Sequence, residues 1–135
     1  MAPQTFTHRV EKPWGYEVIY TPAELARTGK VLFIKKGGQL SLQYHEKKEE
    51  TLCLFSGKAT LQFGSKIEEL ADIDMKQWLG YTVKPGDIHR LIAVEDSYVL
   101  EVSSPEEGTT VRLQDSYGRK NETEKDRDKD RGLAA

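Results

Sequence analysis

Short apolar stretches that end at turn residues constrain the fold of this chain more than any other feature. Each stretch has three to five residues, and glycine, proline or charged residues separate them. One of them, Leu40-Ser41-Leu42-Gln43-Tyr44, alternates apolar and polar side chains, which is the period of a β-strand with one buried face. Short strands with turns between them are typical of β-sandwiches and small barrels. The predicted strands cover residues 16–20, 31–34, 40–44, 51–55, 59–63, 81–83, 91–94, 98–102 and 110–113.

Three segments between these strands are less regular. Ser56-Gly57-Lys58 has the length of a hairpin turn, and glycine suits the positive φ that such turns often need, so the flanking strands are expected to pair. Residues 22–27 begin with proline and allow at most a short helix. Residues 66–78 have no clear period and could form a helix, a long loop or an irregular hairpin. We therefore expect an all-β fold with at most one or two short helices.

The charge pattern divides the chain into two parts. Residues 120–131 hold five basic and five acidic side chains and no apolar one, so this stretch can bury little surface to offset its ordering entropy. We expect residues 120–135 to form a charged tail, flexible rather than held by a partner. Residues 1–119 then form a single domain, since 135 residues are too few for two well-buried cores.

Composition argues against several classes of protein. The net charge of −2 and the pI near 5.9 argue against a broad nucleic-acid-binding surface. No apolar run approaches the roughly 18 to 20 residues that span a bilayer, and the N-terminal residues lack the pattern of a signal peptide. Cys53 is the only cysteine, which excludes an internal disulfide and favours a cytoplasmic location. We expect neither a nucleic-acid nor a membrane partner.

Polar side chains gather around one predicted strand. Every second residue from 39 to 45 is polar, ending at His45, so these side chains share one face of the strand. Burial of such a row costs free energy unless a cation or another partner satisfies it. Glu50 opens the next predicted strand, and the turn at Pro85-Gly86-Asp87 places His89 at the start of a later one. Together with Gln43, these side chains could converge at one end of a barrel.

Gln43, His45, Glu50 and His89 are therefore the predicted ligands of one divalent metal ion. Two imidazoles, a carboxylate and an amide oxygen suit Zn²⁺ first, and also Mn²⁺, Fe²⁺, Co²⁺ or Ni²⁺, with positions left open for water or substrate. A single histidine on a strand usually has a structural role. It is the combination and spacing of the four residues that indicates a metal site.

The same stretches resemble the two sequence motifs of the cupin superfamily. In the first motif His45 is preceded by Gln43 where a second histidine is usual, and Glu50 and Gly57 follow at the family's spacing. The second motif matches at Pro85-Gly86 and His89. The resemblance implies a small double-stranded β-helix, a barrel of the jelly-roll kind.

A closer likeness is to the cupin-type mannose-6-phosphate isomerases, in which a glutamine is a metal ligand. Residues 41–50 are similar to their metal-binding strand, although Thr51 stands where that family often has histidine. Residues 11–17 resemble their N-terminal motif and residues 111–119 their C-terminal one. The resemblance covers residues 8–119 and is closest to the isomerase domain of bifunctional mannose-6-phosphate isomerase/mannose-1-phosphate guanylyltransferases.

This likeness implies aldose–ketose interconversion of a phosphorylated sugar, and it implies a homodimer. The reaction moves a proton between C1 and C2, and Glu50 could bind the metal, act as the base, or do both. Cations must hold the phosphate. Lys48 in the turn and Arg90 after His89 are the candidates beside the metal ligands, although Arg90 points to the opposite face of a regular strand. Arg112 and Arg119 are implied by the resemblance alone.

Two other functions fit the same ligands. Two histidines and one carboxylate also form the site of Fe²⁺-dependent dioxygenases, which would require an apolar pocket that oxygen can reach. A cupin without catalytic activity could instead bind a metal or a sugar as a sensor or partner module.

Overall fold

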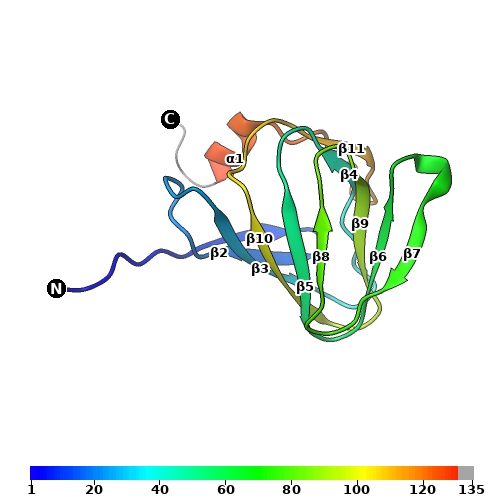
Figure 1. Cartoon of the computed structure of the whole chain (residues 1–135), viewed down its shortest axis with the longest axis horizontal. Helices are drawn as coiled ribbons and strands as arrows, with labels where there is room; N and C mark the ends of the chain where they lie inside the picture. Colours follow the sequence, from blue (N-terminus) through cyan, green and yellow to red (C-terminus); the bar gives the residue numbers. More distant parts are fainter. Residues whose placement is uncertain (131–135) are drawn as a thin grey trace.

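The computed structural model describes residues 1–130, which form two antiparallel β-sheets around one shared interior (Figure 1). In spatial order, the strands of the six-stranded sheet are β1 (His8–Lys12), β2 (Gly15–Ile19), β3 (Thr28–Ile34), β10 (Ser97–Ser103), β5 (Glu50–Ser56) and β8 (Gly80–Val83). The strands of the five-stranded sheet are β11 (Thr110–Gln114), β4 (Leu42–His45), β9 (Ile88–Ala93), β6 (Ala59–Gly64) and β7 (Ala71–Asp74). The short helices are η1 (Ile67–Glu69) and α1 (Glu124–Asp130).

The all-β class and the two short helices are as predicted, and each of the nine predicted stretches contains a strand. Strands β1 and β7 were not predicted. The ambiguous segment 66–78 forms η1, then β7, then a loop, and residues 22–27 form turns and no helix.

The expected hairpin at Ser56-Gly57-Lys58 is wrong. The strands on either side, β5 and β6, belong to different sheets. The turn therefore takes the chain from one sheet to the other and does not form a hairpin. Gly57 has a φ of 95°, and a Cβ at this position would lie 2.2 Å from the carbonyl oxygen of Asp96. Both the backbone conformation and the close contact require glycine here.

The inward-facing side chains change character along the strands. On β10, Val99 is apolar and Glu101, two residues on, is ionisable, and on β5 the same change separates Leu54 from Glu50. The register aligns the change on β10 with the one on β3, where Val99 pairs with Leu32 and Glu101 with Lys30. On β5 the change falls one inward position further along, because Glu101 pairs with Leu52 and Glu50 with Ser103. The interior therefore has an apolar half and a charged half.

The segment after β11 returns to the barrel. Glu122 and Thr110 exchange two backbone hydrogen bonds of 2.8 and 3.0 Å. Arg127 of α1 is 6% exposed, and its Nε lies 3.3 Å from Glu106 Oε2. Residues 131–135 of the predicted tail lie outside the described residues, and the flexibility expected for residues 120–135 stays a prediction.

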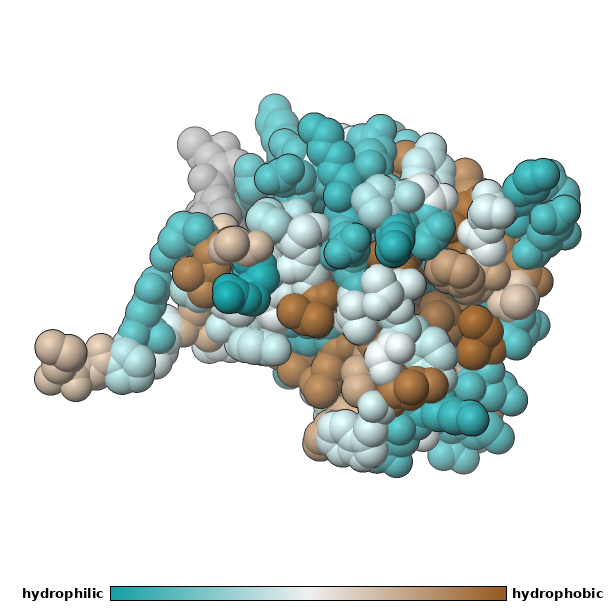
Figure 2. All heavy atoms as spheres, viewed as in Figure 1, coloured by the Kyte–Doolittle hydropathy of each residue, from teal (hydrophilic) through white to brown (hydrophobic). Residues whose placement is uncertain are grey.

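Within residues 1–130, no helix is both long enough and apolar enough to cross a bilayer. In Figure 2, hydrophobic side chains lie among hydrophilic ones over the face that β5, β8 and β10 occupy in Figure 1. Phe55 and Trp78 are exposed, and their rings meet edge to face with centroids 5.1 Å apart. The homodimer implied by the sequence stays a prediction.

Candidate metal centre

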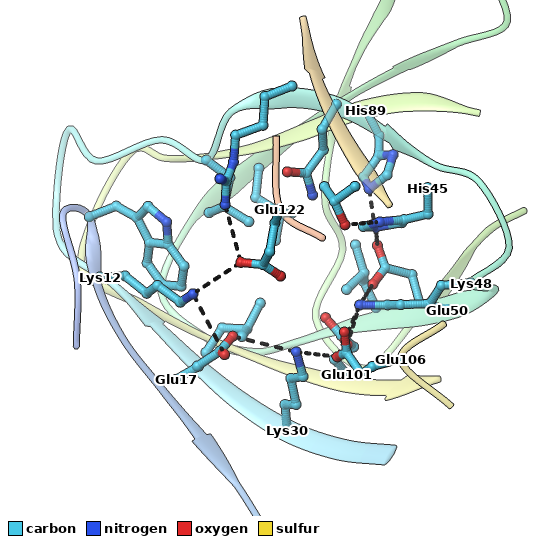
Figure 3. A pocket seen from close by; sticks show the side chains of 18 of the residues that line it. Lys12, Glu17, Lys30, His45, Lys48, Glu50, His89, Glu101, Glu106 and Glu122 are labelled. Atoms are coloured by element: carbon cyan, nitrogen blue, oxygen red, sulfur yellow. Dashed lines mark hydrogen bonds and ion pairs between the residues drawn. The ribbon is translucent and has the colours of Figure 1, made fainter. Parts of the chain in front are cut away.

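Three of the predicted ligands meet in the charged half of the interior. His45 ends β4, Glu50 begins β5, and His89 lies near the start of β9. Glu50 Oε1 is 3.4 Å from His45 Nε2 and 3.0 Å from His89 Nε2 (Figure 3). One ligand atom from each of the three side chains lies within 4.8 Å of the others, and all three residues are buried.

The hydrogen bond of His89 shows why a cation fits this site. Its Nδ1 lies 2.9 Å from the carbonyl oxygen of Asp87, which can only accept, so Nδ1 carries the proton. In a neutral ring Nε2 then presents a lone pair toward Glu50 Oε1, which is also an acceptor. His89 Nε2 is buried without a hydrogen-bond partner among the described residues. A divalent cation bound to both atoms satisfies them, so these residues fit a metal ion.

His45 is oriented in a similar way. Its Nδ1 shares a hydrogen bond of 2.9 Å with Thr110 Oγ1 of β11, which leaves Nε2 facing Glu50. Burial lowers the pKa of His45, and this outweighs the opposing effect of Glu50. The ring is therefore neutral at pH 7, the form that binds a metal.

Glu50 is held as a carboxylate. Burial alone would raise its pKa, but the charge of Lys48 is the largest effect that lowers it, and the pKa lies well below its ordinary value. Lys48 Nζ lies 3.2 Å from Glu50 Oε2 and 3.1 Å from Glu101 Oε2. Burial would lower the pKa of Lys48, but Glu101, Glu106 and Glu50 raise it well above its ordinary value. Lys48 is thus a fixed cation beside the centre.

The fourth predicted ligand, Gln43, lies next to the other three. It pairs with His89 in the β4–β9 register and lines the same pocket. Its Oε1 accepts a hydrogen bond of 2.6 Å from Ser41 Oγ. Coordination by Gln43 stays a prediction.

Arg90 lies elsewhere. It is buried, but it is not among the residues that line this pocket, and its Nη2 donates a hydrogen bond of 3.0 Å to Gln114 Oε1. The strand alternation that turns His89 inward turns Arg90 outward. Its predicted catalytic role stays a prediction, and its position does not support that role.

The pocket around the centre is small and highly charged. Its volume is about 70 Å³, and its lining holds five basic and five acidic side chains. These are Lys12, Lys30, Lys48, Arg112, Arg119, Glu17, Glu50, Glu101, Glu106 and Glu122. Because the five acidic side chains can at most balance the five basic ones, a bound divalent cation would leave the pocket with net positive charge.

Most of these charged residues were not predicted. Glu101 could have been found, because strand alternation places it on the same face as Val99, where a charge is unexpected. Lys30 directly precedes a predicted strand. Glu106 and Glu122 lie between and beyond the strands, and no pattern in the sequence indicates that they turn inward. Arg112 and Arg119, implied by the resemblance alone, do line the pocket.

Glu101 has the most unusual titration of the group. It is 6% exposed, and burial raises its pKa to about 7, with Lys48 opposing the change and Glu50 adding to it. A carboxyl group with a pKa near the working pH can both give and take a proton. Glu101 is thus a candidate for proton transfer within reach of the metal site.

Comparisons with known proteins give the fold. No family model and no curated protein matches the chain. Among solved structures, it is similar to KdgF from a Halomonas species, with 14% identity over 70% of this chain and 82% of that one and a TM-score of 0.61. Oxalate decarboxylase from Bacillus subtilis gives 20% identity, 84% and 32% coverage and a TM-score of 0.69. The capsular polysaccharide assembling protein CapF from Staphylococcus aureus gives 13% identity, 90% and 33% coverage and a TM-score of 0.60.

These neighbours have the cupin fold, and the chain spans about a third of the length of the last two. The chain is therefore a cupin-fold protein, as its motifs predicted. Its buried His45, Glu50 and His89 could hold a metal ion, as expected of a metal-binding cupin.

Proposed function

We propose that this protein is a metal-dependent isomerase that interconverts the aldose and ketose forms of a sugar phosphate. One observation carries the proposal. The His45, Glu50 and His89 centre shares a small buried pocket with Arg112 and Arg119, so a metal that binds sugar oxygens and cations that bind phosphate would face the same substrate.

Each group has a task in this reaction. A bound metal ion would act as a Lewis acid on the sugar's C1 and C2 oxygens. His45, Glu50 and His89 would hold it, with Gln43 as a fourth ligand. The guanidinium group of Arg112 suits a phosphate, because arginine can donate two hydrogen bonds to one anion and Arg112 Nε is without a hydrogen-bond partner among the described residues. Arg119, which stays bound to Asp115, adds positive charge.

The proton between C1 and C2 needs a base that also returns it. Glu50 is ionised and faces both histidines, whereas Glu101 has a pKa of about 7. We assign the proton transfer to Glu101 and metal binding to Glu50. Lys48 lies between them and stays charged, so it orients both carboxylates and does not serve as the base.

The charged lining of the pocket favours this function over an Fe²⁺-dependent dioxygenase. Apolar side chains contribute to the wall, Leu52 and Leu91 among them, but ten lysine, arginine and glutamate side chains accompany them. A site that activates oxygen on an apolar substrate would need a less polar wall. A purely structural or sensory metal site would not need Glu101 beside the ligands.

The test combines metal analysis with proton exchange. Protein loaded with Zn²⁺ or Mn²⁺ should bind about one ion per chain and exchange the C2 proton of mannose 6-phosphate in deuterated water, followed by NMR. Glu50→Gln should lower metal affinity and exchange at least about 100-fold, since even residues behind the ligands contribute roughly 10- to 100-fold. Glu95→Gln, an exposed glutamate near the apolar half, is the matched control.

Two outcomes would contradict the proposal. Metal-loaded protein that exchanges no proton of mannose 6-phosphate or related sugar phosphates would exclude the isomerase. Unchanged metal content in Glu50→Gln would exclude the site. The specific sugar, the homodimer and the cytoplasmic location are further predictions from the sequence.

A further inference from the structure

Glu122 lies where two cavities meet. The pocket of the metal centre and a second, outer cavity of about 350 Å³ share four lining residues, namely Lys12, Arg112, Arg119 and Glu122. These side chains therefore form the wall between the buried centre and the outer cavity. Figure 3 shows Glu122 projecting toward the middle of the inner pocket, across from His45 and His89.

The carboxylate of Glu122 is held only by long contacts with cations, one of them a hydrogen bond from Arg112. Its Oε2 lies 3.4 Å from Arg112 Nη2 and 3.8 Å from Lys12 Nζ, and its Oε1 lies 3.6 Å from Arg127 Nη1. Burial would raise the pKa of Glu122, but Lys12 and Lys30 lower it, so the group is an anion at neutral pH. Charge-assisted hydrogen bonds are usually about 2.7 to 2.9 Å long, so these contacts are loose.

The backbone beneath this carboxylate is held much more firmly. Residue 122 pairs with Thr110 through two hydrogen bonds, and the backbone nitrogen of Arg112 donates a bond of 2.8 Å to Asn121 Oδ1. The side chain of Glu122 can therefore leave its cations while the segment keeps its place.

Arg112 also has an unused donor. Its Nε is buried and has no hydrogen-bond partner among the described residues, whereas Arg119 is already bound to both carboxylate oxygens of Asp115 at 2.9 and 3.0 Å. A buried donor without a partner is costly. Glu122 thus leaves one hydrogen-bond donor of Arg112 without an acceptor, and an anion with more oxygens could accept from it as well.

The space inside the inner pocket is small for its proposed substrate. A volume of about 70 Å³ has room for about five water molecules at roughly 15 Å³ each by the same kind of measure. A hexose phosphate has many more non-hydrogen atoms than that. A sugar phosphate that reaches His45 and His89 must displace side chains. Among the four shared residues, Lys12 and Glu122 have only long contacts, and Glu122 is the anion of the two.

We propose that Glu122 occupies the place of the substrate's phosphate group, and that a phosphate dianion displaces it from Lys12 and Arg112 and so opens the inner pocket. The inference rests on the proposed function for the identity of the substrate. It makes Glu122 a specificity-determining residue. A phosphate compensates both cations when the carboxylate leaves, whereas an uncharged sugar would leave Arg112 without a carboxylate partner and Lys12 with Glu17 alone.

The test measures binding of inorganic phosphate to the full-length, metal-loaded protein by calorimetry. Glu122→Gln removes the competing charge and should tighten phosphate binding about tenfold, the change expected if the closed form makes up roughly 90% of the molecules. Glu107→Gln, which removes an exposed glutamate from the same end of the chain, should change the affinity less than twofold.

Two further variants distinguish competition between the Glu122 carboxylate and phosphate from a general loosening of the contacts around Glu122. Arg127→Gln releases Glu122 from α1 but keeps its carboxylate, so phosphate binding should stay equal or weaken. Adding Arg112→Gln to Glu122→Gln should remove the tenfold gain, because the phosphate site itself is lost. Equal affinity in wild type and Glu122→Gln, or an equal gain in Arg127→Gln, would overturn the inference.

These results are independent of catalysis. If phosphate binding responds as expected but no C2 proton exchanges, the proposed isomerase fails and the anion site stands. If exchange occurs and Glu122→Gln leaves phosphate binding unchanged, the isomerase stands and the role of Glu122 fails.

Discussion

The two halves of the barrel interior are built from the same strands but do opposite things. In the apolar half Ile34, Leu54 and Val99 are at most 2% exposed and contact one another within a single hydrophobic cluster. In the charged half Lys30 and Glu101 occupy the equivalent inward positions of β3 and β10, 6% exposed each. Burial of apolar side chains stabilises the fold, whereas burial of charged ones costs free energy that only their partners offset.

This difference shows which part of such a small domain can hold a functional site. The strands continue without interruption from one half into the other, so the apolar half fixes the backbone of the charged half. Lys30, Lys48 and Glu106 form ion pairs in that frame. Each partner there is both buried and paired, which is the arrangement that holds ionisable groups at defined positions.

The largest expected effect is a loss of stability caused by a substitution in the apolar half. Leu61→Ala, at a side chain that is 2% exposed, should lower the free energy of unfolding by about 3 kcal/mol through lost burial and a cavity. Metal affinity should change little, because the ligands lie in the other half. Urea unfolding and metal titration check both statements, with the half-exposed Leu113→Ala as control. A loss of metal binding in folded Leu61→Ala would show that the halves are not separable.

A substitution in the charged half should have a smaller effect on stability, and this effect should depend on pH. The pKa of Glu101 is about 7 in the folded chain, above its ordinary value of 4.5, so folding favours its protonated form. That stabilising contribution is complete below pH 4.5 and is lost as pH rises through 7. Glu101→Gln cannot titrate, so its stability relative to wild type should rise by about 2 kcal/mol between pH 5 and pH 8.

Urea unfolding at several pH values, with the metal removed by a chelator, measures this difference. Glu95→Gln should show no such trend. A stability difference between Glu101→Gln and wild type that stays constant across the range would mean that Glu101 is already ionised at pH 5.

The smallest effect concerns the hydroxyl behind His45. Thr110→Val keeps the shape of the buried side chain but removes the hydrogen bond to His45 Nδ1, so the ring is no longer held with Nε2 toward Glu50. Metal affinity should fall about tenfold. Thr51→Val removes an exposed hydrogen bond to Thr82 on the opposite face of β5 from Glu50 and should leave metal affinity unchanged. Equal affinities in both variants would argue against an orienting role for Thr110.

The apolar half was largely predictable from sequence because it repeats one pattern. Short apolar stretches and turn residues predicted the positions of nine strands. β7 escaped prediction because its apolar–polar alternation covers only four residues, none of them fully buried, within a longer segment that has no clear period. The pairing of strands was less predictable. Gly57 stands where a hairpin glycine is common, yet its turn connects strands of two different sheets and packs against Asp96. A local sequence pattern does not distinguish a hairpin turn from a turn between sheets.

The charged half was predictable only where one strand carries the signal. Polar alternation led to Gln43 and His45, and a turn placed His89 at the start of a strand. In a regular strand the same alternation would place Leu40 on the opposite face from Gln43. Instead, β4 begins at Leu42, and Leu40 lines the same pocket as Gln43. Glu106 and Glu122 come from segments without a repeating pattern, so only the three-dimensional arrangement brings them to the site.

The position of β10 has a consequence for how this domain forms. β10 lies between β3 and β5 and joins them, so during synthesis the larger sheet stays in two pieces until residues 97–103 have left the ribosome. Pairings between such distant segments are slow to form, because the chain loses entropy before the contacts reward it. Glu101 arrives on this closing strand. The apolar cluster is complete once Val99 of the same strand has arrived, whereas Glu106, Arg112 and Glu122 of the charged half come later in the chain. The charged half is therefore the last part of the interior to leave water as a nascent chain folds.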